Sequence, residues 1–531
     1  MSNPVWFLLG VILATAYPTG SEPLRFAGNP WAAPAAWAAA LALLGGVSAL
    51  FYRRVESPRT FRIGRLVLKT SALATFGVLV FLFHHPLFVW EKLRVEAVPL
   101  AADLAVLLPF LSLMGIHGWC ASGAETRLRG AGAASGIRSF AWRTFLGFSL
   151  FPVLVMVGLQ SLVFSSTAVL KLASIYPFAG WILALGLIAA ALAAAPLYLR
   201  LVFRARPLPA GPARERLEAL ARRAGFRCRE ILVLGTGGAR VANAFIVGLH
   251  ERLRYVFFTD AIVEGMSESE LECVMAHEMS HGLRRHLLHY LLFSVAFLVL
   301  VLFVLEFLSS APGLVTAAVT FCGAFAFWVV IFGFVSRRFE TEADLVGMRA
   351  ADAGGAQEPL ARSRRFAAAL YRVADLNHVP PDAGSWRHFS IARRAAILLE
   401  AEVRPESGRA WIRACEALRT AVWTALLFSV LYGAVLVRNQ IARVPEARRN
   451  WERVEMASEG WRRLQAGRAA EAVPLLEESA RHPHASGELW LVLSEAYAKA
   501  GRGDDAAAAR RKAAEIGVAD PRARMRLLRA P

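Results

Sequence analysis

The stretch that decides the fold is His277-Glu278-Met279-Ser280-His281, which has the spacing H-E-x-x-H. On a helix, its two histidines lie one turn apart on the same face, so both imidazoles can bind one Zn²⁺. Glu278 stands beside the first ligand, where a carboxylate can accept a proton from a water that the metal activates. Ser267 and Glu270 form a capping-box pattern and predict that this helix begins near Glu268.

A zinc site that keeps an open position for water needs a third protein ligand. The segment Glu340-Thr341-Glu342-Ala343-Asp344 offers carboxylates at i and i+4 of a second predicted helix, Glu340 and Asp344. One of them can bind the metal, while the other hydrogen-bonds the far nitrogen of a zinc histidine and fixes its tautomer. The side chain of Glu342 is expected to point elsewhere. His286 and His289 fall off the face of His277 and His281, so we expect them at the membrane entry.

The composition indicates a membrane protein. Hydrophobic residues make up 56% of the 531-residue chain and charged residues only 19%, and the mean hydropathy is +0.44. Apolar runs of sufficient length and low charge predict nine spans, or eight if the short first run or the run with Asp103 is not one. They are 4–19, 31–51, 68–90, 97–117, 144–166, 178–200, 287–308, 313–335 and 418–437.

Two of these spans, 287–308 and 313–335, separate the halves of the proposed metal site. An even number of crossings returns Glu340 to the side of His277, which a shared metal requires. In this arrangement the chain resembles the HtpX-type membrane zinc endopeptidases, the family that includes the CAAX prenyl endopeptidases. There a transmembrane hairpin also separates H-E-x-x-H from a later E-x-x-A-D, which here runs from Glu340 to Asp344. The resemblance covers about residues 140 to 400 and implies a gluzincin-like domain with a small β element.

The resemblance also implies roles for individual residues. It makes Glu340 the third zinc ligand, with Asp344 behind a zinc histidine. Ala242-Asn243-Ala244-Phe245 looks like the edge strand that holds substrate backbone, which makes Asn243, Ala244 and Phe245 substrate-binding residues. His388-Phe389-Ser390-Ile391-Ala392-Arg393-Arg394 is similar to the H-P-x-x-x-x-R element, with Phe389 in place of the usual proline. His388 and Arg394 would stabilise the oxyanion there, although Arg393 could take the place of Arg394.

Basic residues in the loops predict the orientation. Five arginines follow the second predicted span and four follow the fourth, whereas the loop after the fifth has only Lys171. Because arginine and lysine are enriched in cytoplasmic loops, we expect 201–286 and 336–417 in the cytoplasm and the segment after 437 outside. The site would then face the cytoplasm from an integral membrane protein, which we assign to a bacterial inner membrane.

The C-terminal region has a repeat of 34 residues. Gly460 recurs as Ser494, Gly467 as Gly501, and Ala472 as Ala506. This period is typical of tetratricopeptide repeats, which would bind a protein partner, and an ordinary pair of helical hairpins explains it equally well. A terminal helix near Pro521–Leu528 could support the repeats.

We therefore expect a mainly α, multi-pass transmembrane protein in seven segments. They are a membrane region of about four spans (1–140), a transmembrane pair (141–200), the first catalytic half (201–286), a transmembrane hairpin (287–336), the second catalytic half (337–417), a further span (418–437) and repeats (450–531). The expected function is hydrolysis of membrane or membrane-associated proteins with one Zn²⁺ per chain. The alternative is an inactive scaffold that recruits partners through its repeats. The net charge of +19 is spread over loops, which argues against a nucleic-acid partner and for contact with anionic lipid.

Overall fold

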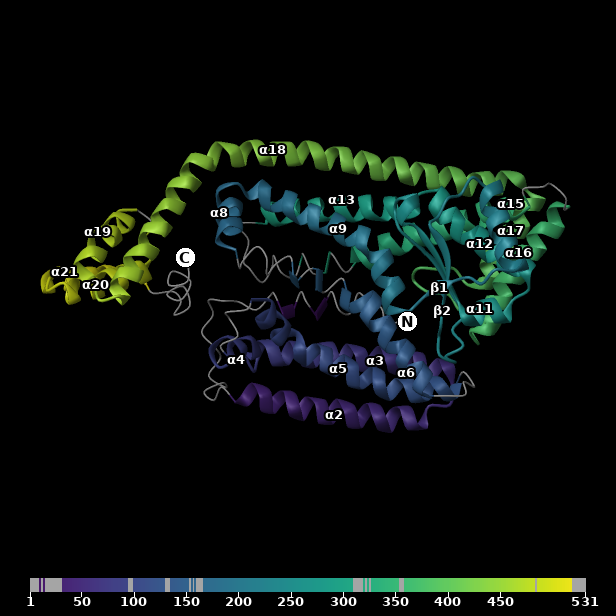
Figure 1. Cartoon of the computed structure of the whole chain (residues 1–531), viewed down its shortest axis with the longest axis horizontal. Coiled ribbons are helices and arrows are strands. Elements are labelled where there is room, and N and C mark those ends of the chain that lie inside the picture. The colour runs from purple at the N-terminus through teal and green to yellow at the C-terminus, as the bar shows by residue number, and fades with distance from the viewer. Residues whose placement is uncertain are drawn as a thin grey trace.

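The computed structural model is mainly helical with one small sheet, which confirms the predicted fold class. It describes residues 9–10, 13–14, 31–93, 99–128, 134–151, 154–155, 157–158, 166–308, 319, 322–323, 326–352, 358–482 and 485–517. Two layers of long helices run in parallel between two ends of the molecule (Figure 1). The sheet and its surrounding helices form one end, and three short helices form the other.

The membrane layers come mostly from the first 202 residues. Their helices are α2 (Ala32–Arg54), α3 (Pro58–Phe81), α4 (His85–Glu91), α5 (Pro99–Leu128), α6 (Ala134–Thr144), the π-helix η3 (Phe145–Leu150), α8 (Thr167–Ile175) and α9 (Pro177–Val202). Helices α2, α3 and α5 contact one another and form one layer (Figure 1). Helix α9 lies in the other layer, along with α13 (His286–Phe307) and α18 (Pro405–Gln465).

Five described helices are long and apolar enough to cross a membrane, and one bent pair could add a sixth span. The five are α2, α3, α5, α9 and α18, and the bent pair joins the helix of the H-E-x-x-H stretch to α13. The predicted spans 31–51, 97–117, 178–200 and 287–308 therefore correspond to helices. The predicted span 4–19 lies largely outside the described residues, and the predicted spans 144–166 and 313–335 are described only in part.

The predicted span 68–90 was wrong at both ends. Helix α3 begins ten residues earlier, where Pro58 occupies the first turn and the Ser57 hydroxyl accepts a hydrogen bond from the Thr60 N–H. It ends at Phe81, and His84 then takes a left-handed conformation with φ 49° before the separate helix α4. Of the five arginines expected in a loop here, Arg53 and Arg54 lie in the last turn of α2 and the other three lie in the first turns of α3. Long basic side chains at a helix end can reach the membrane surface, so these turns tolerate charge.

The end of the molecule that carries the H-E-x-x-H stretch is built around a four-stranded sheet in the order β1-β2-β4-β3. Its elements are β1 (Arg206–Pro207), α10 (Pro212–Arg223), β2 (Glu230–Leu234), β3 (Ala244–Val247), the 3₁₀ turn η4 (Glu251–Leu253), β4 (Tyr255–Thr259), α11 (Asp260–Gly265), α12 (Glu268–Leu283), the π-helix η5 (Phe327–Phe332), α15 (Gly333–Ala351), α16 (Pro359–Leu376) and α17 (Ile391–Val403). Strand β3 runs antiparallel to β4 at the edge of the sheet and contacts α12, which confirms the predicted edge strand.

Helix α18 joins the two ends of the molecule. Its 61 residues correspond to about 90 Å of helix, so the predicted span 418–437 and the start of the repeats share one helix. Helices α19 (Ala469–Ala480), α20 (Gly487–Lys499) and α21 (Gly503–Ile516) follow it and pack as hairpins. Gly467 and Gly501, 34 residues apart, both have positive φ at the turns. Residues 521–528, the predicted terminal helix, lie outside the described part of the chain.

Candidate metal centre

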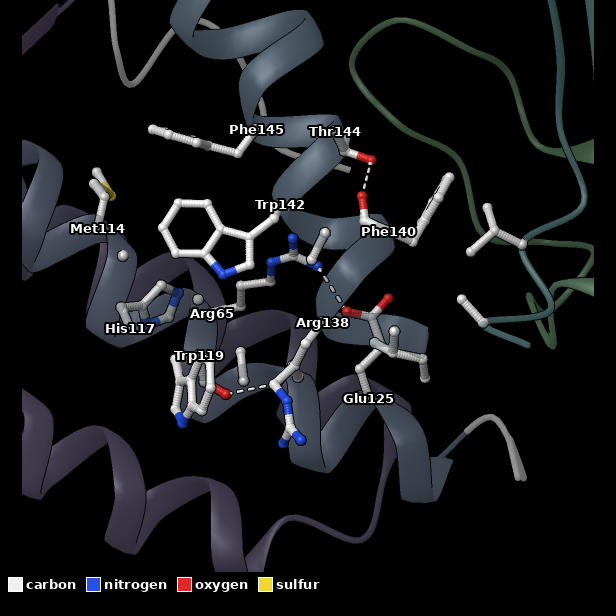
Figure 2. A pocket seen from close by; sticks show the side chains of 18 of the residues that line it. Arg65, Met114, His117, Trp119, Glu125, Arg138, Phe140, Trp142, Thr144 and Phe145 are labelled. Atoms are coloured by element: carbon white, nitrogen blue, oxygen red, sulfur yellow. Dashed lines mark hydrogen bonds and ion pairs between the residues drawn. The ribbon is translucent and has the colours of Figure 1, made fainter. Parts of the chain in front are cut away.

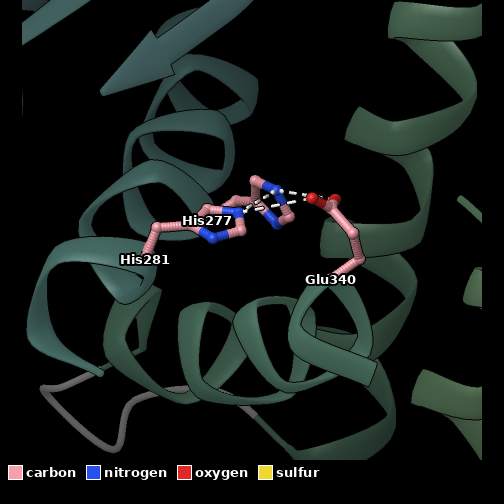
Figure 3. A group of neighbouring side chains, drawn as sticks. All are labelled: His277, His281 and Glu340. Atoms are coloured by element: carbon pink, nitrogen blue, oxygen red, sulfur yellow. Dashed lines mark hydrogen bonds and ion pairs between the residues drawn. The ribbon is translucent and has the colours of Figure 1, made fainter. Parts of the chain in front are cut away.

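Two helices bring the first metal-ligand candidates together. Ser267 and Glu270 form the predicted capping box, and α12 begins at Glu268 as expected. His277 and His281 project from this helix toward Glu340 on α15 (Figure 3). The Nε2 atoms of the two imidazoles are 3.3 Å apart, and they lie 3.6 Å and 3.7 Å from the Glu340 carboxylate oxygens. One ligand atom from each residue therefore lies within 4.8 Å of the others.

Close packing of α12 on α15 sets this spacing. A Cβ atom at Gly347 would lie 3.0 Å from the backbone of Ala276 and His277, so the two helices approach at a glycine. Phe339, Ala343 and Met348 are buried on the same helix. The backbone of α15 is thus held directly against the turn that carries His277.

The far nitrogen of each candidate histidine has a hydrogen-bond partner. His277 Nδ1 lies 2.9 Å from Asp344 Oδ1, as the sequence predicted for a supporting carboxylate. Asp344 is itself held by the Arg394 guanidinium, whose Nη2 and Nε donate over 2.6 Å and 2.7 Å. This paired geometry fixes both the ring and the carboxylate.

The sequence analysis missed the partner of His281. Its Nδ1 lies 2.9 Å from Nδ1 of His286, and His286 Nε2 lies 2.8 Å from the carboxylate of Glu342. Arg284 and Arg419 also bind Glu342, which is fully buried. The network thus extends from a candidate metal ligand to α18.

His286 and His289, which we expected at the membrane entry, lie at the start of α13, and both are buried, with exposed fractions of 1% and 6%. The cause is a break in the helix. Helix α12 ends at Leu283, Arg285 takes φ 54°, and α13 starts at an angle of 45°. His286 therefore turns back onto His281, which a continuous helix would not allow. The sequence feature that could have indicated this partner of His281 is a third histidine, five residues after the H-E-x-x-H stretch.

Burial and charge set the protonation of the centre. Burial lowers the pKa of both imidazoles, and that of His281 falls well below its ordinary value. At His277, hydrogen bonds to Asp344 and Glu340 outweigh burial and raise the pKa to about 10. Burial opposes ionisation of Glu340, but the neighbouring His388 and the two imidazoles hold its pKa well below the usual range. The centre therefore pairs an ionised carboxylate with two imidazoles, and His277 would release a proton to bind a metal as a neutral ligand.

A cavity of about 340 Å³ opens beside His277, His281 and Glu340. Nine of the ten predicted site residues line it, and Asp344 lies behind His277. The nine are Asn243, Ala244, Phe245, His277, Glu278, His281, Glu340, His388 and Arg394. Burial raises the pKa of the Glu278 carboxyl to about 7, and the backbone N–H of Ile246 in β3 hydrogen-bonds that carboxyl. The proposed base thus lies between the metal-ligand candidates and the edge strand.

The edge strand presents alternate backbone groups to the cavity. The carbonyl of Asn243 accepts from the Thr259 N–H of the neighbouring segment, so residues 243, 245 and 247 face β4. Ala244 and Ile246 then direct their N–H and C=O groups to the open edge. The ring of Phe245 stacks on that of Phe257 at 4.8 Å between centroids, which anchors the strand.

The structure places the two arginine alternatives differently. Arg394 is buried, lines the cavity and binds Asp344. The guanidinium of Arg393 instead lies 4.2 Å from the centre of the Phe389 ring. His388 Nδ1 lies 3.2 Å from Glu340 Oε2, and its side chain is partly exposed at the cavity.

The donor set fits zinc. Two neutral imidazoles and one carboxylate are the ligands of His₂Glu zinc hydrolase sites, and the remaining position faces a cavity that holds water-sized molecules. Asp344 and His286 occupy the far nitrogens, as partners of zinc histidines commonly do.

A protein-family model matches the segment that holds most of this site. Residues 207–373 match the family described as Peptidase family M48, a segment that runs from β1 into α16. It contains His277, Glu278, His281, Glu340 and Asp344, whereas His388 and Arg394 lie beyond it. A comparison with curated proteins finds no match. Among solved structures, the crystal structure of S. mikatae Ste24p is similar over 74% of this chain and 98% of that chain, at 17% identity and a TM-score of 0.39. The chain therefore carries a peptidase domain of family M48 over residues 207–373.

Proposed function

We propose that this chain is a membrane-embedded, zinc-dependent endopeptidase that cleaves peptide bonds of membrane or membrane-associated proteins. The observation that carries the proposal is the convergence of His277, His281 and Glu340 beside the buried Glu278, within a peptidase domain. Two imidazoles and the Glu340 carboxylate can hold a metal, and the second carboxylate, Glu278, is left to accept a proton from water. This combination of groups favours hydrolysis.

His277, His281 and Glu340 would hold the zinc, which supplies Lewis-acid catalysis when bound. Glu278 accepts the proton of the attacking water and passes it to the nitrogen of the leaving amine. His388 lies at the cavity surface, where its ring can donate to the developing oxyanion. Arg394 is already paired with Asp344, so it contributes positive charge from the cavity wall and keeps His277 in position.

Substrate recognition in this proposal is mainly through the main chain. An extended peptide would add to β3 as a further strand and use the N–H and C=O of Ala244 and the C=O of Ile246, since the Ile246 N–H bonds Glu278. This mode places a scissile carbonyl beside Glu278 without requiring one particular side chain. It suits an enzyme that acts on several membrane proteins, in quality control or processing.

We further propose that the metal centre faces the cytoplasm of a bacterial inner membrane. The arginine-rich end of α2 and the end of α5 lie together, since Arg127 donates to the Tyr52 carbonyl over 2.6 Å. Figure 1 places this end of the layers next to the sheet. The positive-inside tendency then favours a cytoplasmic site, with the hairpins of α19–α21 available to a protein partner on the other side.

The test combines metal content with one substitution. Purified full-length protein should contain about one zinc per chain. Glu278→Gln should keep the zinc and lose peptide-bond hydrolysis by about two to four orders of magnitude, because only the proton acceptor is removed. Glu264→Gln, an exposed carboxylate on α11, is the matched control and should behave as the parent.

Each part of the proposal can fail separately. Protein without zinc, never exposed to chelator, would refute the metal centre. An active Glu278→Gln enzyme would refute the base, and a zinc-loaded parent that cleaves no membrane protein would favour the scaffold alternative.

A further inference from the structure

A second cavity, of about 160 Å³, lies between α3, α5 and α6 at the end of the membrane layers that adjoins the sheet (Figure 2). It shares no lining residue with the cavity of the metal centre. Ala239 and Val241, in the loop that leads into β3, close one side of it. The proposed peptidase activity assigns no role to this cavity.

Positive charge gathers in this second cavity. Arg65 and Lys69 line it from α3, and Arg138 lines it from α6. The one carboxylate in the lining is Glu125, whose Oε2 lies 3.7 Å from Arg65 Nη1. Three cations against one carboxylate leave an excess of positive charge, which an anion would neutralise.

A buried imidazole in the same lining is independent evidence for a ligand. His117 is 1% exposed, and neither of its ring nitrogens has a hydrogen-bond partner among the described residues. Buried polar atoms without a partner are rare in folded proteins because their desolvation is uncompensated. A ligand with oxygen atoms that enters the cavity would provide the missing hydrogen bond.

The rest of the lining suits an amphiphile at a membrane surface. Trp119 and Trp142 line the cavity and are 57% and 47% exposed, and the Arg138 guanidinium lies 4.9 Å from the centre of the Trp119 ring. Exposed tryptophans beside arginine and lysine are typical of the headgroup level of a bilayer. A ligand here would keep its charged group inside and its apolar chains in the surrounding lipid.

We propose that this cavity binds the phosphate headgroup of an anionic phospholipid. Arg65, Lys69 and Arg138 would bind the phosphate oxygens, and His117 would hydrogen-bond the headgroup. The bound lipid would contact both the membrane helices and the loop before β3. Helix α6 meets the catalytic end closely here, since a Cβ atom at Gly136 would lie 1.4 Å from the Gly237 carbonyl oxygen. The lipid would therefore lie where the membrane helices contact the end of the molecule that carries the sheet.

Binding can be measured without any assay of proteolysis. The full-length chain in neutral detergent is titrated with phosphatidylglycerol, phosphatidylcholine or inorganic phosphate, and bound molecules are counted by native mass spectrometry. We expect one phosphatidylglycerol per chain at concentrations where the other two do not bind. Equal binding of phosphatidylcholine, or equal binding of inorganic phosphate, would overturn the assignment to an anionic lipid.

A charge variant locates the site. Lys69→Gln with Arg138→Gln removes two cations of the cavity. It should weaken phosphatidylglycerol binding about thirtyfold, which is twice the usual free-energy contribution of a single basic residue near anionic lipid. Arg62→Gln with Arg143→Gln is the matched control, because it removes the same charge from the same helices outside the lining. Equal loss in both double variants would mean diffuse attraction and would refute the site.

A steric variant keeps every charge. Gly118 lines the cavity, and a Cβ atom there would meet nothing within 4 Å, so Gly118→Leu should fill the space without disturbing α5. Gly123→Leu is the control, since it lies in similarly open space on the same helix but outside the lining. We expect only Gly118→Leu to abolish stoichiometric binding. Undiminished binding by that variant would exclude this cavity as the lipid site.

Discussion

At the scale of single residues, hydrogen bonds assign the tautomers of the metal-site histidines. Both Nε2 atoms face Glu340, so each ring would bind a metal through an unprotonated Nε2 and would then carry its proton on Nδ1. His277 then donates to Asp344, and His281 donates to Nδ1 of His286. His286 in turn carries its proton on Nε2 and donates to Glu342. His286 is therefore a positioning residue for His281.

We expect His286→Ala to weaken zinc binding about 10- to 100-fold, the usual cost of removing the partner of a zinc histidine. Zinc affinity is measured by competition with a chelator. The control is His289→Ala, whose ring bonds the Arg285 carbonyl and contacts no metal ligand. His286→Gln should recover much of the affinity, because its amide can accept from His281 and donate to Glu342. Parent-like zinc affinity in His286→Ala would remove the positioning role.

The pH dependence of hydrolysis should report Glu278. Burial raises its pKa to about 7, and a nearby zinc ion would favour the ionised form and bring the value down. The base must be ionised, so kcat/KM should fall as the pH drops through this pKa, with a midpoint at or below about 7. Glu264→Gln should leave the profile unchanged. An acid limb centred well above pH 7 would mean that another group controls the rate.

At the scale of elements, the proposed substrate binding depends on the edge position of β3. Ala244→Pro removes one open-edge N–H but no hydrogen bond to β4, so the sheet should remain intact. We expect a higher KM for peptide substrates with unchanged zinc content. Phe245→Pro is the contrast, because it removes a hydrogen bond to β4 and should lower the stability of the sheet. If Ala244→Pro binds and cleaves peptides as the parent does, β3 is not the substrate platform.

Helix ends could be predicted more reliably than helix breaks. The capping box at Ser267 depends on neighbouring residues only, and the structure has it where the sequence predicted it. The bend after Leu283 and the break at His84 depend on the packing of whole helices. Apolar run length alone therefore misplaced the ends of 68–90, and helical register alone did not predict the contact of His286 with His281.

At the scale of the whole molecule, α18 connects the metal centre to the repeats. Arg419 binds the buried Glu342 at one end, and Glu455 pairs with Lys171 at 2.6 Å near the other. Figure 1 shows the sheet and helices α19–α21 at opposite ends of the layers. Helix α18 would thus connect a partner bound at the repeats with the site.

Sidedness follows from this arrangement and can be tested with single cysteines. In a background without the five native cysteines, Gly384→Cys should resist a membrane-impermeant thiol reagent in intact cells and react after permeabilisation. Ala508→Cys on α21 should react in intact cells. Both positions are exposed. The same response at both positions would place the two ends on one side of the membrane, and labelling of Gly384→Cys alone would reverse the orientation.

The sequence by itself determined the parts whose geometry is local. Helical spacing put His277 and His281 on one face and Glu340 and Asp344 on another, and an even number of crossings allowed the two pairs to meet. Only the tertiary structure decided which groups complete them. The His286 and Glu342 network, the open-edge groups of β3 and the cationic cavity between α3, α5 and α6 join residues far apart in the chain. Such contacts depend on where helices bend and on how closely they pack. The spacing of residues within one helix determines neither the bend nor the packing.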